Sequence, residues 1–99
     1  MRHVNLALPE SATLEACGLL AVDLPGIVAA GTGTLHVDAS KVRCFDSTVL
    51  ALLLHARRLA QEAGRGGICL SGAPTAMLEL ARLYGVDTLL HFEHADNFS

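Results

Sequence analysis

The sequence predicts an α/β domain with a small, mostly parallel sheet and helices mainly on one face. From residue 34 onward, strand-like runs alternate with helix-like stretches, which is the pattern of parallel strands joined by right-handed crossovers. The 99 residues are 52% hydrophobic and 17% charged, a composition that suits one folded core rather than disorder. We therefore expect a single domain over residues 1–99, with too few helices to cover both faces of its sheet.

The first third of the chain carries weaker signals. Alternation of Val4, Leu6 and Leu8 predicts a strand that Pro9 ends. Residues 12–17 fit a second strand or a turn, and residues 19–31 fit one helix or two short turns. Pro25 suits the first turn of a helix that runs to Ala30 and is closed by Gly31.

The rest of the chain is more regular. Apolar residues recur at a period of 3.6 between residues 47 and 63, which predicts a helix stopped by Gly64. Pro74 and Gly85 bracket a second such helix, with Met77, Leu80, Ala81 and Tyr84 on its inner face. The expected strands are residues 34–40, residues 42–45 as an extension or a separate strand, residues 66–72, and a last short strand over 86–92.

Composition and charge exclude several classes of function. The net charge is −3 and no basic cluster stands out beyond Arg57-Arg58, so we expect no binding to nucleic acid. The longest apolar run, Val49–Leu54, is far shorter than the roughly 20 residues of a membrane-spanning helix. No secretory signal is evident, so we expect a cytoplasmic protein without direct membrane insertion.

Candidate metal and catalytic residues form no convincing set. The three cysteines have no CxxC spacing, and we expect buried free thiols, because Cys44 and Cys69 lie in apolar runs. His91 and His94 lie close together but lack a second ligand cluster. The glycine-rich residues 64–67 carry no GK[ST] and predict a turn. We expect no metal, no cofactor and no enzymatic activity.

The junction Asp46-Ser47-Thr48, where a strand-like run meets the helix of residues 47–63, has two interpretations. Asp46 or Ser47 fits the N-cap of that helix, which would explain the polar residues by capping alone. The same position suits a partner contact or a phosphate on Ser47, since a helix N-terminus favours negative charge. On a helical wheel Leu50 and Leu54 lie away from the core face, as a half-exposed patch or under a neighbouring element.

Residues 36–90 resemble a STAS domain, the family of sulfate transporters and anti-sigma-factor antagonists. The resemblance rests on a strand ending in VDAS, on DSTV at a helix start, and on the stretches LALLLHARRLAQEAG and ELARLYGV. It implies the STAS fold. The likeness is greatest to small STAS subunits of Mla-type ABC transporters, which maintain the lipid asymmetry of the outer membrane.

This resemblance implies a non-enzymatic assembly or regulatory subunit that binds the ATPase subunit of the transporter. Such subunits make the contact through the hydroxyl residue after the aspartate and the helix that follows. A partner, or a second copy of the chain in a homodimer, would also cover part of the open sheet face. The matching contact residues are Asp46, Ser47, Thr48, Leu50 and Leu54, with Arg57 at the rim.

The family also implies an alternative function. In anti-sigma-factor antagonists the matching hydroxyl is phosphorylated by a serine kinase, so Ser47 would be the phosphorylation site and a kinase or anti-sigma factor the partner. The family usually has glycine at the position of Val49, which leaves room for another backbone to approach. Val49 therefore disfavours a tight complex with a kinase.

Overall fold

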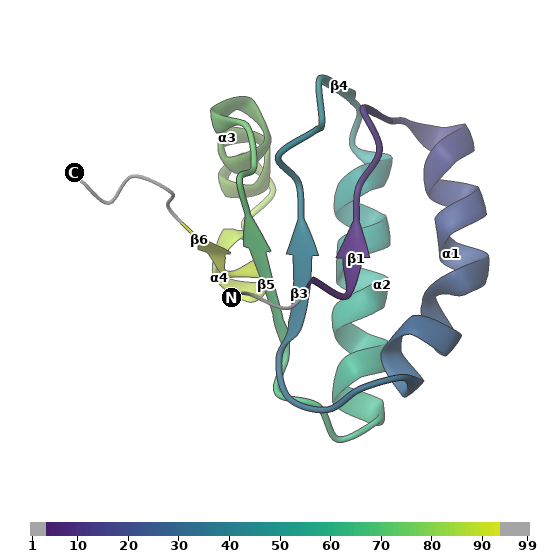
Figure 1. Ribbon diagram of the computed structural model, residues 1–99. Helices are drawn as coiled ribbons and strands as arrows, with labels where there is room; N and C mark the ends of the chain where they lie inside the picture. The colour runs from purple at the N-terminus through teal and green to yellow at the C-terminus, as the bar shows by residue number, and fades with distance from the viewer. Residues whose placement is uncertain (1–3, 94–99) are drawn as a thin grey trace.

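A computed structural model of the chain describes residues 4–93. Its main sheet has four strands in the order β1-β3-β5-β6, and every neighbouring pair is parallel. Figure 1 shows β1, β3 and β5 side by side. The strands are β1 (Leu6–Ala7), β3 (Leu35–Asp38), β5 (Ile68–Ser71) and β6 (Phe92–Glu93).

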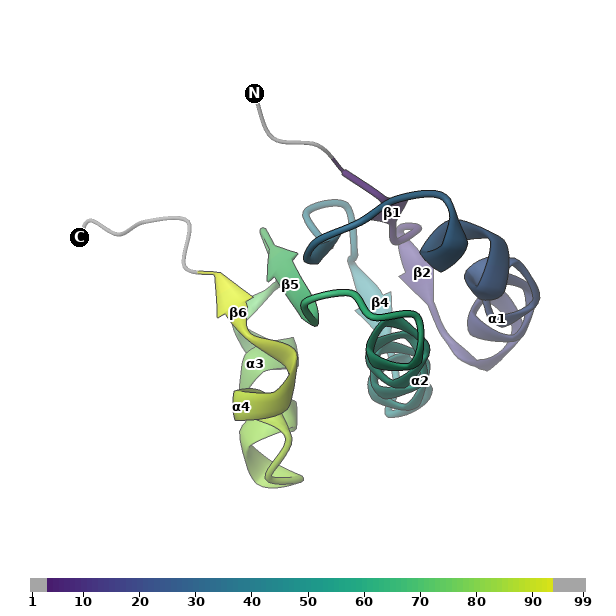
Figure 2. The same ribbon diagram turned by 90° about the horizontal axis from the view of Figure 1, so that it is seen from below.

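The helices lie on one face of this sheet, as Figure 2 shows most clearly. Helix α1 packs along α2, and α4 contacts both α2 and β5. The predicted α/β class, with a small parallel sheet and helices on one face, is confirmed. The helices are α1 (Leu14–Ala29), α2 (Thr48–Glu62), α3 (Thr75–Leu83) and α4 (Asp87–Leu90).

Alternation along the central strands separates the core from the open face. Leu35 and Val37 of β3 are buried, and each pairs in register with a buried residue of β5. The intervening residues, His36 and Asp38, are only half-buried and share their face with Cys69 and Ser71. The face without helices is therefore polar, while the apolar side chains pack under the helices.

A second sheet has two strands. Strand β2 (Ser11–Ala12) pairs in parallel with β4 (Cys44–Phe45). Strand β4 therefore follows β3 as a separate element and does not extend it. It brings the chain directly to the start of α2.

The helix predicted over residues 47–63 is confirmed as α2. Its apolar positions Val49, Leu52, Leu53, Ala56 and Ala60 are buried, as their period required. Gly64 follows the helix with a positive φ of 79°, which a glycine adopts without strain. The helix predicted between Pro74 and Gly85 is likewise confirmed as α3.

The N-terminal helix differs from the prediction. Residues 12–17 do not form a strand or turn as a whole, since α1 already begins at Leu14. Pro25 lies inside α1 rather than in its first turn. Pro25 is exposed, while Leu24 and Val28 beside it are buried. Packing of these apolar residues stabilises α1 and offsets the cost of a proline in the interior of the helix.

Three further predictions are wrong. Of the expected last strand over residues 86–92, residues 87–90 form α4, and only Phe92–Glu93 pairs with β5. Tyr84 is 56% exposed and does not belong to the inner face of α3. Cys44 is exposed, because β4 lies outside the main sheet, whereas Cys17 is buried and Cys69 is half-buried.

Candidate functional site

The Asp46-Ser47-Thr48 junction lies where two helices begin. In Figure 1 the starts of α1 and α2 and the strand β4 lie at the same end of the molecule, beyond the carboxyl ends of β1 and β3. In open α/β sheets, ligands and partners are met at this end of the strands. The side chains of the junction are therefore candidates for contact with a ligand or partner.

Asp46 supplies the cap of α2. The backbone N–H of Thr48 donates to Asp46 Oδ1 at 3.0 Å, and the Thr48 hydroxyl donates to the same oxygen. Both hydrogen bonds hold the pKa of Asp46 below its usual value, and the bond from the hydroxyl has the larger effect. Partial desolvation acts in the opposite direction and raises the pKa. Asp46 is therefore ionised near neutral pH and satisfies a free N–H group of the first turn.

Ser47 occupies the N-cap position but does not cap the helix. Its backbone is already helical, with φ −64° and ψ −14°, whereas N-cap residues usually have extended geometry. Its side chain makes no capping hydrogen bond and is exposed. Because Asp46 performs the capping, the Ser47 hydroxyl is left at the surface, at the positive end of the α2 dipole.

The start of α1 lies near the same carboxylate. The backbone N–H of Leu14 also contributes to the lowered pKa of Asp46. Behind it, burial raises the pKa of the Cys17 thiol; a hydrogen bond with Thr48 opposes this rise, and the charge of Asp46 adds to it. Cys17 is thus a protonated structural thiol, and the starts of the two helices lie next to each other at this junction.

An apolar groove of about 290 Å³ runs from this junction between the two helices. Leu14, which forms part of the groove wall, is 69% exposed. A Cβ added at Gly18 would meet no atom within 4 Å, so the groove is open above this glycine. The groove is lined by Leu14, Cys17, Gly18 and Ala21 of α1 and by Thr48, Ala51, Leu52 and His55 of α2.

Comparison with known protein families identifies the fold. A family model described as "Mlab, STAS domain" matches residues 2–91. The chain belongs to the STAS domain family. A search of curated proteins finds no match. Membership of this family indicates a regulatory or assembly role, and the STAS resemblance predicted for residues 36–90 is confirmed.

The STAS structure places the predicted contact residues in three different surroundings. Asp46, Ser47 and Thr48 lie together at the exposed start of α2. Leu50 is only 2% exposed and belongs to the core, so of the two alternatives for Leu50, cover by a neighbouring element is the one that the structure shows. Leu54 is half-buried and packs against the core, and Arg57 is half-buried farther along α2. Whether these residues bind a partner stays a prediction.

The open apolar surface lies on a different side of α2 from the predicted patch. Ala51 and His55 border the groove, whereas Leu50 points into the core. Leu14 and Gly18 complete the groove from α1. These residues could not be predicted from the sequence, because α1 begins earlier than its pattern indicates and a groove between two helices can be predicted only when both helices are placed.

Val49 is fully buried, so its side chain does not occupy the surface beside Ser47. The inference that Val49 obstructs a kinase is therefore not supported by its position.

Among residues 4–93, no three His, Cys, Asp or Glu side chains gather as a metal site. His94 of the weighed histidine pair lies outside the described residues. In the described part of the chain, no helix has the length and apolar character to cross a membrane.

Proposed function

We propose that this STAS domain is a non-enzymatic assembly or regulatory subunit that binds the ATPase subunit of an ABC phospholipid transporter. In this function it acts on the cytoplasmic side of the membrane and supports lipid asymmetry. The observation that carries the proposal is the exposed Ser47 hydroxyl, free of the helix cap and next to an apolar groove. The match to a family model described as "Mlab, STAS domain" supports the choice of partner.

The groove and the junction would contribute different parts of the contact. Leu14, Ala51 and the floor at Gly18 offer apolar area to an apolar segment of the ATPase subunit. The exposed carboxylate of Asp46 and the hydroxyl of Ser47 offer polar contacts at the groove's end. Such a pairing, an apolar centre with a polar rim, is typical of stable protein interfaces.

Two glycines of α1 provide a matched test. Neither Gly18 nor Gly26 has an atom within 4 Å of an added Cβ, but Gly18 lines the groove and Gly26 does not. We expect Gly18→Leu to fill the groove and to weaken binding of the purified ATPase subunit at least ten-fold in calorimetric titration. Gly26→Leu should bind like the wild type. Equal binding by both variants would remove the groove from the contact.

The alternative is an anti-sigma-factor antagonist that is phosphorylated at Ser47. Two observations favour it: the hydroxyl is exposed at a helix N-terminus, and the buried Val49 leaves that surface open. Intact mass measurement of the protein from its native cells separates the two functions. An added phosphoryl group that disappears in Ser47→Ala supports the switch, whereas an unmodified protein that copurifies with the ATPase subunit supports the transporter.

A further inference from the structure

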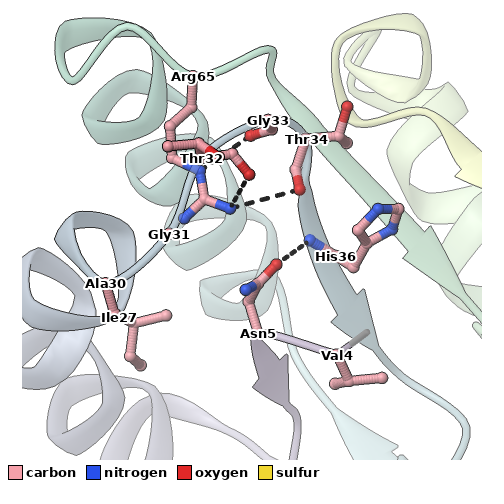
Figure 3. A pocket seen from close by; sticks show the side chains of 10 residues that line it. All are labelled: Val4, Asn5, Ile27, Ala30, Gly31, Thr32, Gly33, Thr34, His36 and Arg65. Atoms are coloured by element: carbon pink, nitrogen blue, oxygen red, sulfur yellow. Dashed lines mark hydrogen bonds between the residues drawn. The ribbon is translucent and has the colours of Figure 1, made fainter. Parts of the chain in front are cut away.

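A second hollow lies at the opposite end of α2 from Ser47. It has a volume of about 710 Å³, within the range of small-molecule sites. It is bounded by the end of α1, the loop before β3 and the start of β1, and Arg65 reaches into it from the loop after α2 (Figure 3). None of its lining residues is an aspartate or glutamate.

Arg65 carries a buried positive charge at this place. The residue is 7% exposed, and its guanidinium donates to four backbone carbonyls. Within residues 4–93 no carboxylate pairs with it, so the carbonyl dipoles solvate the charge without neutralising it. The four acceptors are the carbonyl oxygens of Gly33 (2.9 Å), Val28 (3.0 Å), Thr32 (3.2 Å) and Thr34 (3.4 Å).

One guanidinium donor is left over. An arginine has five N–H groups, and these four bonds use the Nε group, one Nη1 group and both Nη2 groups. The second Nη1 N–H has no partner among these carbonyls. Arg65 therefore combines a net positive charge with one N–H group that no residue of the described part of the chain accepts.

Asn5 adds a second donor from the other side of the hollow. Its Oδ1 accepts the backbone N–H of His36 at 2.8 Å, and this bond fixes the orientation of the amide. Figure 3 shows the Asn5 side chain reaching from the start of β1 toward the guanidinium of Arg65, while the His36 ring turns away. The amide NH₂ group is thus held in the hollow, facing the same space as Arg65.

We infer that this hollow binds an oxyanion of the phosphate type, held by the charge and free N–H of Arg65 and by the Asn5 amide. Two kinds of donor, one net positive charge and no acid in the lining select an anion over a cation or an apolar ligand. The phosphate group can come from inorganic phosphate or from a phosphomonoester, whose organic part the remaining volume would hold. This inference does not depend on the proposed partner.

The test titrates the full chain with inorganic phosphate, with glycerol 3-phosphate and with glycerol, at constant ionic strength. Amide chemical shifts of residues 31–36 and of the Asn5 side chain report binding at the hollow. We expect saturable shifts with both phosphates and none with glycerol. Tighter binding of glycerol 3-phosphate would identify a phosphomonoester as the ligand, and equal affinity would identify the phosphate group alone.

A matched pair of variants tests the assigned donors. Asn5→Asp keeps the oxygen that accepts from His36 but replaces the amide donor with a negative charge. Gln61→Glu makes the same charge change on an exposed residue of α2, outside the hollow. We expect at least ten-fold weaker phosphate binding in Asn5→Asp and wild-type binding in Gln61→Glu.

A third variant keeps the test decisive if Asn5→Asp is unstable. Thr32 is exposed at the rim of the hollow, so Thr32→Asp adds a negative charge there without disturbing the bond to His36. It should also weaken binding at least ten-fold. The absence of saturable shifts in the wild type, or wild-type affinity in the folded Asp variants, would overturn the inference.

Discussion

Asp46 and Ser47 are adjacent at the start of α2, and either side chain could cap this helix. In the structure Asp46 is the cap, and the Ser47 hydroxyl makes no capping hydrogen bond. Asp46 accepts from the N–H of Thr48 and from its hydroxyl, so the helix is capped without Ser47. The sequence identified the junction but left the capping residue open. The choice depends on the backbone angles at Ser47, which are set by how β4 delivers the chain to α2.

This difference predicts that only one of two alanine substitutions lowers the stability. Asp46→Ala should lower the free energy of unfolding in urea titrations, because the N–H and the hydroxyl of Thr48 lose their acceptor. Ser47→Ala should leave it unchanged within error. A comparable loss in Ser47→Ala would show that its hydroxyl takes part in the cap.

The cap formed by Asp46 also predicts how the stability of the protein depends on pH. Because hydrogen bonds lower the pKa of Asp46 in the folded state, its contribution is complete above the ordinary aspartate pKa of about 3.9. It is lost as the pH falls through the lower folded-state pKa. The stability difference between wild type and Asp46→Ala should therefore be largest near pH 7 and should shrink below about pH 4. A difference that is the same at pH 7 and pH 3 would contradict the assigned cap.

Leu50 and Leu54 test the boundary between core and surface. Leu50 is 2% exposed, so Leu50→Ala should lower the free energy of unfolding by about 2–5 kcal/mol. Leu54 is half-buried, and Leu54→Ala should cost clearly less. Chemical denaturation measures both losses. A small loss for Leu50→Ala would contradict the burial of this leucine in the core and would favour a place at the surface.

Among the secondary-structure elements, those with a regular pattern were predictable and the others were not. The period of 3.6 placed α2, and glycine and proline at its ends placed α3. Helix α1 is apolar on both its buried and exposed sides, with Leu19 and Val22 at 70% and 77% exposure, so its period is hidden. Helix α4 has four residues, which is too short for any period to show.

Glycines in different elements should respond in opposite ways to alanine. Gly26 lies in α1 with open space at its Cβ position, so Gly26→Ala should raise the free energy of unfolding by about 0.5–1 kcal/mol. Gly72 has φ +70°, and an added Cβ would lie 2.7 Å from Ser40 Cβ. Gly72→Ala should therefore destabilise the protein. Thermal unfolding of the two variants checks both signs, and a stabilised Gly72→Ala would contradict the packing of the two loops.

In the whole molecule, the one-sided arrangement of helices sets which surfaces remain for partners. The open face of the sheet is polar, with His36, Asp38 and Ser71 half-buried. An open apolar surface is found instead in the groove between α1 and α2. The sequence predicted an uncovered sheet face, but its polar character followed only from the register of β3 against β5.

The decisive measurement is the affinity of the purified protein for the ATPase subunit of the ABC phospholipid transporter from the same cell, in wild type, Ser47→Asp and Thr75→Asp. Thr75 is an exposed residue at the start of α3, so both substitutions add an acid at a helix N-terminus, where the fold tolerates it. We expect wild type and Thr75→Asp to bind equally and Ser47→Asp to bind at least ten-fold more weakly. Equal binding by all three, or no binding by the wild type, would contradict a docking surface at Ser47.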